Sequence, residues 1–188
     1  MFSEIDIKGL EIKKNKLFKK DIDLIVSDFD DTIFSTSEII EKDIRKWRRW
    51  KEWNVYIREV IWIKNFIDAF YVGKNFPKKI ISKLRQNHDL ILTTWFEDIQ
   101  SEKIKACKLD HINYRIVENH EDKILEMIKY IVEYLQFIPN KITVYEDKPK
   151  YYLDYISFLE DFFWIDIDII QVSMINNNTE PKLKNREG

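Results

Sequence analysis

Residues 24–34, LIVSDFDDTIF, constrain this chain more than any other stretch. The stretch begins with apolar, mostly β-branched residues, which predict a strand buried inside a sheet. It ends abruptly in the carboxylates of Asp28, Asp30 and Asp31 and the hydroxyl of Thr32. A buried parallel strand does not tolerate acids along its length. We therefore expect these groups at its carboxyl end, where open α/β sheets bind ligands.

Asp28 and Asp30 alternate with Phe29, so in an extended chain both carboxylates point to the same side. Two carboxylates that converge in a cleft repel each other unless a cation, a proton or hydrogen-bond donors offset their charge. A hard divalent ion is the simplest solution. The stretch therefore indicates Mg²⁺ as a cofactor.

The remaining patterns predict an α/β fold. Helical patterns alternate with short apolar strands, which are expected at residues 90–92, 114–117, 142–145 and 165–172. The helical patterns cover residues 77–87, 98–109, 122–137 and 149–163. Strands that alternate with helices of this length form βαβ units. We expect a Rossmann-like, three-layer fold with a mainly parallel central sheet and helices on both faces.

Two helical patterns follow each other after the first strand, with no strand between them. We therefore expect residues 37–74 to form a small α-helical cap, inserted into a core made of residues 1–36 and 75–175. Residues 5–18 alternate around Gly9, which predicts a short hairpin or edge strand. Residues 176–188 are polar and are expected to form a disordered tail.

Composition excludes several classes of function. With 31 basic and 33 acidic residues the formal net charge is −2, so no overall field predicts binding to nucleic acid or membranes. The chain has only three glycines, so a Gly-rich phosphate-binding loop is not expected. The single cysteine, Cys107, allows no intramolecular disulfide and no cysteine-based zinc site. No apolar run resembles a signal peptide or a membrane span, so a cytoplasmic protein is the expectation.

Polar residues also follow two later strands. Thr93 and Thr94 follow the second expected strand, and Glu146 and Asp147 follow a later one. Because the carboxyl ends of parallel strands lie along one edge of a sheet, these groups can converge with Asp28. Carboxylates, threonines and a nearby lysine suit metal-assisted phosphoryl transfer. One carboxylate attacks phosphorus, a second acid protonates the leaving oxygen, and the cation offsets phosphate charge.

Four segments resemble, in the right order, the four motifs of the haloacid dehalogenase (HAD) superfamily. Residues 28–32, DFDDT, resemble the first motif, DxDxT, and residues 90–93, LILT, resemble the second. Lys123, which opens a long predicted helix, fits the lysine of the third motif. Residues 143–147, TVYED, resemble the fourth motif, an apolar strand that ends in an acidic pair. The resemblance covers residues 21–172.

The resemblance implies a magnesium-dependent phosphatase and gives its residues roles. Asp28 would be the nucleophile that is transiently phosphorylated, and its other oxygen would hold the metal. Asp30 would be the general acid and base, and its backbone carbonyl would be another metal ligand. Thr93 would hydrogen-bond the transferring phosphoryl group, and Lys123 would offset charge on it and on Asp28.

Other assignments leave alternatives open. Asp147 would complete the metal site, and Glu146 would support it directly or through water, or be a surface acid. Thr94 competes with Thr93 for contact with substrate. Thr32 would contact substrate or cap its own turn.

A lysine on a helix commonly lies on a solvated face, so other lysines compete for the role of Lys123: Lys103, Lys105 and Lys108. The histidines lack ligand spacing, and a surface role or a satisfied buried role is expected for them: His88, His111 and His120. The chain also departs from the common family pattern. Asp31 stands where glycine is frequent, and Trp95 crowds the loop that follows Thr93.

The predicted cap is rich in tryptophan and arginine. Its tryptophans are Trp47, Trp50, Trp53 and Trp62, and its neighbouring arginines are Arg45, Arg48 and Arg49. One interpretation is an aromatic and cationic surface, with Arg48 and Arg49 binding a nucleobase or a nucleic-acid end. The other is a hairpin with an aromatic inner stripe and a solvated basic face, which helical spacing favours. A protein partner could use the same surface.

The sequence thus predicts a phosphatase that acts on a small phosphorylated molecule, a nucleotide included. The alternatives are a polynucleotide phosphatase that processes nucleic-acid ends and a non-catalytic binding or scaffold protein of the same fold. Asp30 favours an enzyme, because a degenerate member would be expected to have lost this acid.

Overall fold

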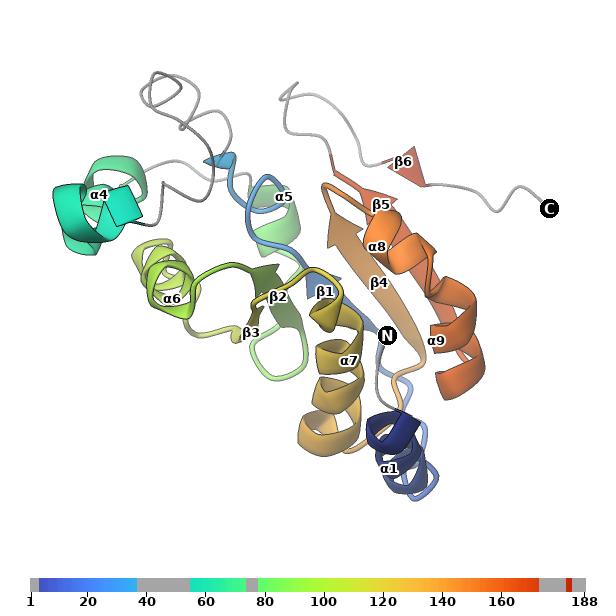
Figure 1. Ribbon diagram of the computed structural model, residues 1–188. Coiled ribbons are helices and arrows are strands. Elements are labelled where there is room, and N and C mark those ends of the chain that lie inside the picture. The colour runs from blue at the N-terminus through green and yellow to red at the C-terminus, as the bar shows by residue number, and fades with distance from the viewer. Residues whose placement is uncertain (1–3, 37–54, 74–77, 173–181, 184–188) are drawn as a thin grey trace.

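The computed structural model describes residues 4–36, 55–73, 78–172 and 182–183 (Figure 1). Its strands form one sheet in the order β3-β2-β1-β4-β5-β6. Their bounds are β1 Leu24–Ser27, β2 Leu90–Thr94, β3 Asn113–Val117, β4 Lys141–Glu146, β5 Asp166–Gln171 and β6 Lys182–Leu183. The first five strands run parallel, and β6 pairs antiparallel with β5. The predicted mainly parallel sheet is confirmed, with β1 between β2 and β4.

Successive side chains of each central strand enter different cores, as the pleat of a strand requires. In β1, Leu24 and Val26 are buried in one apolar core, and Ile25 packs against the other. In β2, Leu90 and Leu92 join the first core while Ile91 joins the second. A strand with apolar side chains on both faces must be covered on both sides, so helices flank this sheet on both faces.

The first core packs under α1 (Glu4–Lys14), α7 (Asp122–Lys129), the π-helix η2 (Tyr130–Leu135), α8 (Lys150–Leu153) and α9 (Ile156–Phe163). The second packs under α5 (Lys78–Ile81) and α6 (Glu97–Ala106) and extends to the π-helix η1 (Tyr56–Ile61) and α4 (Ile63–Phe70). Figure 1 shows α7 and α9 on one face of the sheet and α5 on the other. This arrangement confirms the predicted three-layer α/β fold.

The helix expected over residues 122–137 forms as α7 and continues directly into η2. Its buried side chains recur at three- and four-residue spacing: Ile124, Met127, Ile128 and Ile131. The helix ends at Gln136, which adopts a left-handed conformation. Lys123, in its first turn, is thereby fixed to a rigid element that packs against β2 and β3.

The hairpin or edge strand expected at residues 5–18 is wrong, because the chain forms helix α1 there. Leu10 and Lys14 of α1 are buried, and Ile7 packs beside them, at helical spacing. The Lys14 ammonium donates a hydrogen bond to the Phe162 carbonyl at 2.8 Å. Because one of the buried positions of α1 is a lysine, its buried face is not an apolar stripe in the sequence. The helical period of this segment could therefore not be recognised from apolar residues alone.

Three further expectations need correction. The helix expected over residues 77–87 is limited to α5, and the helix expected over residues 149–163 is interrupted between α8 and α9. The tail expected to be disordered contains two residues, Lys182 and Leu183, that pair with β5.

No described helix is both long enough and apolar enough to cross a membrane.

Part of the predicted cap can be compared with the structure. Residues 55–73 are mostly helical, as expected, but Trp62 separates η1 from α4 because its backbone adopts a φ of 72°. Trp62 is exposed, whereas Phe66 and Ile67 of α4 are buried in the second core. The remaining residues assigned to the cap surface lie outside the described residues: Arg45, Trp47, Arg48, Arg49, Trp50 and Trp53.

Candidate active site

The loop after β1 is a tight turn held by one carbonyl group. The Phe29 carbonyl accepts hydrogen bonds from the backbone amides of Thr32, Ile33 and Phe34, at 3.4, 3.0 and 3.0 Å. Asp31 adopts a φ of 59°, a left-handed conformation that aspartate tolerates better than most residues.

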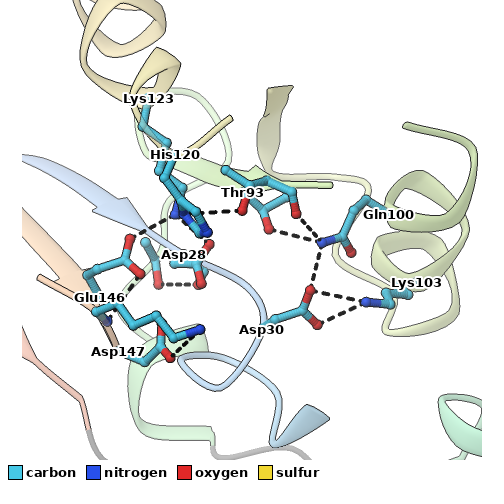
Figure 2. Close-up of polar contacts among 12 residues, drawn as sticks. Asp28, Asp30, Thr93, Gln100, Lys103, His120, Lys123, Glu146 and Asp147 are labelled. Carbon is cyan, nitrogen blue, oxygen red and sulfur yellow. Dashed lines mark hydrogen bonds and ion pairs between the residues drawn. The ribbon is translucent and has the colours of Figure 1, made fainter. Parts of the chain in front are cut away.

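The turn separates the two aspartates that an extended chain would place together. Asp28 contacts Lys123, whereas Asp30 contacts Gln100 and Lys103 (Figure 2). The expectation that both carboxylates share one side is therefore corrected, because the chain turns immediately after Phe29. Each aspartate has its own set of partners.

Asp28 belongs to an acid cluster, which consists of Asp28, Glu146 and Asp147. One carboxylate oxygen from each of these residues lies within 4.8 Å of one from each of the others. Lys123 joins two of them, since its ammonium lies 2.8 Å from Asp28 Oδ1 and 2.8 Å from Glu146 Oε2. Asp28, Glu146 and Lys123 are all buried. Lys123 is thus brought together with Asp28 and Glu146, two of the other candidate residues.

The acid cluster carries more negative than positive charge, because its three carboxylates are accompanied by two ammonium groups, that of Lys123 and that of Lys148, 3.8 Å from Asp147 Oδ2. Burial raises the pKa of Asp28, and Lys123 only partly opposes this. Burial and the neighbouring Asp28 raise the pKa of Glu146 to about 8. Burial lowers the pKa of Lys123, but the two carboxylates outweigh it and raise the pKa above its usual range. The cluster favours an added positive charge.

Asp30 lies in a balanced environment on the other side of the loop. Both of its carboxylate oxygens accept from the Lys103 ammonium, at 3.0 and 3.1 Å. Gln100 donates to Asp30 Oδ2 at 2.6 Å, and the Thr36 hydroxyl donates to Oδ1. Burial raises the pKa of Asp30, but Lys103, Thr36 and Gln100 together outweigh it and lower the pKa.

The threonines differ in what they contact. Thr93 is buried, and its hydroxyl lies 3.2 Å from the amide nitrogen of Gln100. The Thr94 hydroxyl lies 3.4 Å from Nδ1 of His120. Thr32 is fully buried, and its hydroxyl has no hydrogen-bond partner among the described residues. Of the three, Thr93 is joined to Asp30 through Gln100.

Two aromatic side chains line the site near Thr94. His120 stacks on Tyr151, with ring centroids 4.7 Å apart and planes 5° from parallel. Trp95, after Thr94, adopts a φ of 138° and places its ring 4.4 Å from the Lys103 ammonium. Trp95 therefore covers the lysine that pairs with Asp30.

Sequence reasoning missed Gln100 and Thr36, and it named Lys103 only as a competitor for the role of Lys123. A signal for Gln100 and Lys103 exists in the spacing of α6, where they are buried together with Ile104. For His120 a surface or a satisfied role was expected, and it is half-buried with its Nδ1 3.4 Å from the Thr94 hydroxyl. Arg48 and Arg49, predicted to contact substrate, lie outside the described residues.

Comparisons of the chain with protein families, with curated proteins and with solved structures found no match. The carboxyl ends of β1, β2 and β4 bring together a buried carboxylate bonded to a lysine, two further acids, a buried threonine and a second aspartate with donors of its own.

Proposed function

We propose that this chain is a magnesium-dependent phosphatase of the HAD type that hydrolyses phosphate monoesters of small molecules, nucleotides among them. The observation that carries the proposal is the setting of Asp28. Its carboxylate is buried, one oxygen is bonded to Lys123, and the Glu146 and Asp147 carboxylates lie beside it. Such a carboxylate suits attack on an electrophile whose charge is offset by nearby cations.

The proposed reaction has two steps. In the first, an oxygen of Asp28 bonds to phosphorus while the bond from phosphorus to the ester oxygen breaks, and that oxygen takes a proton from Asp30. In the second, water gives a proton to Asp30, and its oxygen bonds to phosphorus. The bond from phosphorus to Asp28 breaks, which releases inorganic phosphate and restores both aspartates.

Two further residues support this chemistry. Lys123 offsets the negative charge of Asp28 and of a phosphoryl group bound against it, because its ammonium is fixed at 2.8 Å from Asp28 Oδ1. Thr93 is at the end of β2, buried, and can donate its hydroxyl proton to a phosphoryl oxygen. Both residues are held on rigid elements, which limits reorganisation during the reaction.

The chemistry of the donor set fits Mg²⁺. Asp28, Asp147 and the backbone carbonyl of Asp30 would hold the ion, with Glu146 in support, and carboxylate and carbonyl oxygens are the ligands that Mg²⁺ prefers. Burial raises the pKa of Asp28 and, together with the charge of Asp28, that of Glu146, so an added cation would favour the ionised form of both carboxyls. When bound, the ion would supply charge that stabilises the phosphoryl oxygens.

The experiment is a hydrolysis assay of the purified chain with and without Mg²⁺, using p-nitrophenyl phosphate, mononucleotides and oligonucleotides that carry a terminal phosphate. We expect Mg²⁺-dependent hydrolysis that EDTA removes. Asp28→Asn is expected to lose about 1,000-fold or more of kcat, because it removes the nucleophile. Asp161→Asn, which changes an exposed aspartate of α9, is the matched control and should retain activity.

The same assay separates the alternatives. Higher kcat/KM on oligonucleotides than on mononucleotides would favour a nucleic-acid end-processing phosphatase. Absence of hydrolysis on every substrate, with Mg²⁺ still bound, would favour a non-catalytic binding or scaffold protein. Hydrolysis retained by Asp28→Asn would contradict the assignment of the nucleophile.

A further inference from the structure

Helix α6 presents two polar side chains to Asp30, and both are completely buried. Gln100 and Lys103 each have 0% of their surface exposed. Lys103 contacts both carboxylate oxygens of Asp30, at 3.0 and 3.1 Å, which fixes the plane of the carboxylate as well as its position. A lysine is rarely buried to this extent unless it is paired, so Asp30 and Lys103 hold each other in place.

Gln100 connects Asp30 to the neighbouring strand end. Its amide nitrogen lies 2.6 Å from Asp30 Oδ2, 3.2 Å from Thr93 Oγ1 and 2.8 Å from the Thr94 carbonyl. Asp30 and Thr93 are therefore held at fixed positions relative to each other by one side chain. In the proposed reaction these two residues act on the same phosphate ester.

These contacts also keep the Asp30 carboxylate out of the acid cluster. The cluster consists of Asp28, Glu146 and Asp147, and the Asp30 carboxylate is turned toward α6 instead (Figure 2). A fourth carboxylate in the cluster would add repulsion or take up a metal coordination site. Held apart from the cluster, the Asp30 carboxylate adds no repulsion there and occupies no metal coordination site.

We propose that Gln100 and Lys103 are positioning residues that aim the Asp30 carboxylate at the ester oxygen beside Thr93 and away from the acid cluster. The proposal rests on the phosphatase function proposed above and deepens it. Neither residue bonds to the substrate. Their effect on the reaction passes through Asp30, so it should be large only where a proton must reach the leaving group.

The experiment compares two esters of similar shape, p-nitrophenyl phosphate and p-nitrobenzyl phosphate. A nitrophenolate leaves without a proton, whereas a benzyl alkoxide needs one. The measured quantity is kcat/KM, which depends on steps up to transfer of the phosphoryl group to Asp28 and excludes hydrolysis of the intermediate. The variants are Lys103→Met and Gln100→Leu. The control is Lys105→Met, on the same helix but exposed and paired with Glu102.

A positioned general acid contributes roughly 100-fold or more. We therefore expect Lys103→Met and Gln100→Leu to lower kcat/KM for the benzyl ester by about 100-fold and for the phenyl ester by less than about 10-fold. Lys105→Met should change neither. Combining Lys103→Met with Asp30→Asn should cost no more than Asp30→Asn alone, because both act through one group.

Equal losses on the two esters, or no loss on either, would overturn the positioning role. Failure of the wild-type protein to hydrolyse either ester would instead count against the phosphatase function itself. Thermal melts identify variants that do not fold. If Lys103→Met does not fold, Gln100→Leu decides the same comparison, since it removes hydrogen bonds without removing a buried charge.

Discussion

Asp28 and Asp30 lie on one loop, and each is paired with a buried lysine from a different helix, yet their surroundings differ in charge. On the Asp28 side, Lys123 of α7 contacts the carboxylates of Asp28 and Glu146, and Asp147 lies beside them, 3.8 Å from the Lys148 ammonium. On the Asp30 side, Lys103 of α6 faces one carboxylate, with Gln100 and Thr36 as additional donors. The pKa of Asp28 is raised and that of Asp30 is lowered.

The difference in charge indicates which side of the site would bind a cation. On the Asp30 side the carboxylate itself is fully paired, although Gln100 Oε1 is buried without a hydrogen-bond partner among the described residues. The Asp28 side has unbalanced negative charge in a buried place, which is costly unless a cation joins it. A balanced half can hold a proton-transfer group in place, and an unbalanced half can bind a metal ion.

The largest expected effect is on stability. Lys123→Met leaves buried carboxylates without their ammonium partner and should lower the free energy of unfolding by about 3–5 kcal/mol at pH 8. Lys103→Met should cost less, about 1–3 kcal/mol, because Asp30 is a quarter exposed and keeps Gln100 and Thr36. Urea unfolding measures both. Equal costs would show that the two sides do not differ as described.

A smaller effect is expected from Mg²⁺. At a free concentration about 100 times its dissociation constant, the ion should raise the free energy of unfolding by about 2.7 kcal/mol. Asp147→Asn, which changes the acid cluster, should greatly reduce this gain. Asp30→Asn should retain it, because the backbone carbonyl remains and the side chain is engaged with α6. Equal losses in the two variants would place the Asp30 carboxylate among the metal ligands.

The smallest effect concerns His120, which adjoins the Asp28 side. Burial and the positive charges of Lys123 and Lys148 lower the pKa of His120 below 6.5. Because the unfolded chain binds the proton more tightly, this residue contributes stability above pH 6.5 that is lost as the pH falls through the folded-state pKa.

An NMR titration of the His120 ring measures that pKa directly. Lys123→Met should move the pKa of His120 upward, whereas Lys103→Met, on the other side of the loop, should move it less. Equal shifts in the two variants would contradict the assignment of His120 to the Asp28 side.

Much of the fold follows from the sequence, because its strands are short apolar runs that end in polar residues. The strand over residues 24–27 and the acids after it can be recognised in the sequence, because the residues change abruptly from apolar to acidic at the end of the strand. α1 was not predictable in the same way. Its buried face includes Lys14, whose charged end reaches the Phe162 carbonyl, and that contact exists only in the folded chain.

The residues of the site also divide into those that could be predicted from the sequence and those that could not. Residues at strand ends, such as Asp28, Thr93 and Asp147, could be predicted to gather because parallel topology places strand ends together. Lys103 could not be predicted to lie beside Asp30, because a lysine within a helix is commonly solvated. Its role depends on which loop of the folded chain faces it. The reversal of direction between Asp28 and Asp30 depends on the turn at Phe29, which sequence alone does not reveal.

The turn held by the Phe29 carbonyl has a consequence for turnover. Phe29, Thr32 and Ile33 are completely buried, and the amides of the turn are bonded to one oxygen. Such a segment can open its amides to exchange with solvent only when much of the domain opens. The entropy of ordering both aspartates is therefore lost once, when the chain folds, and is not lost again in each catalytic cycle.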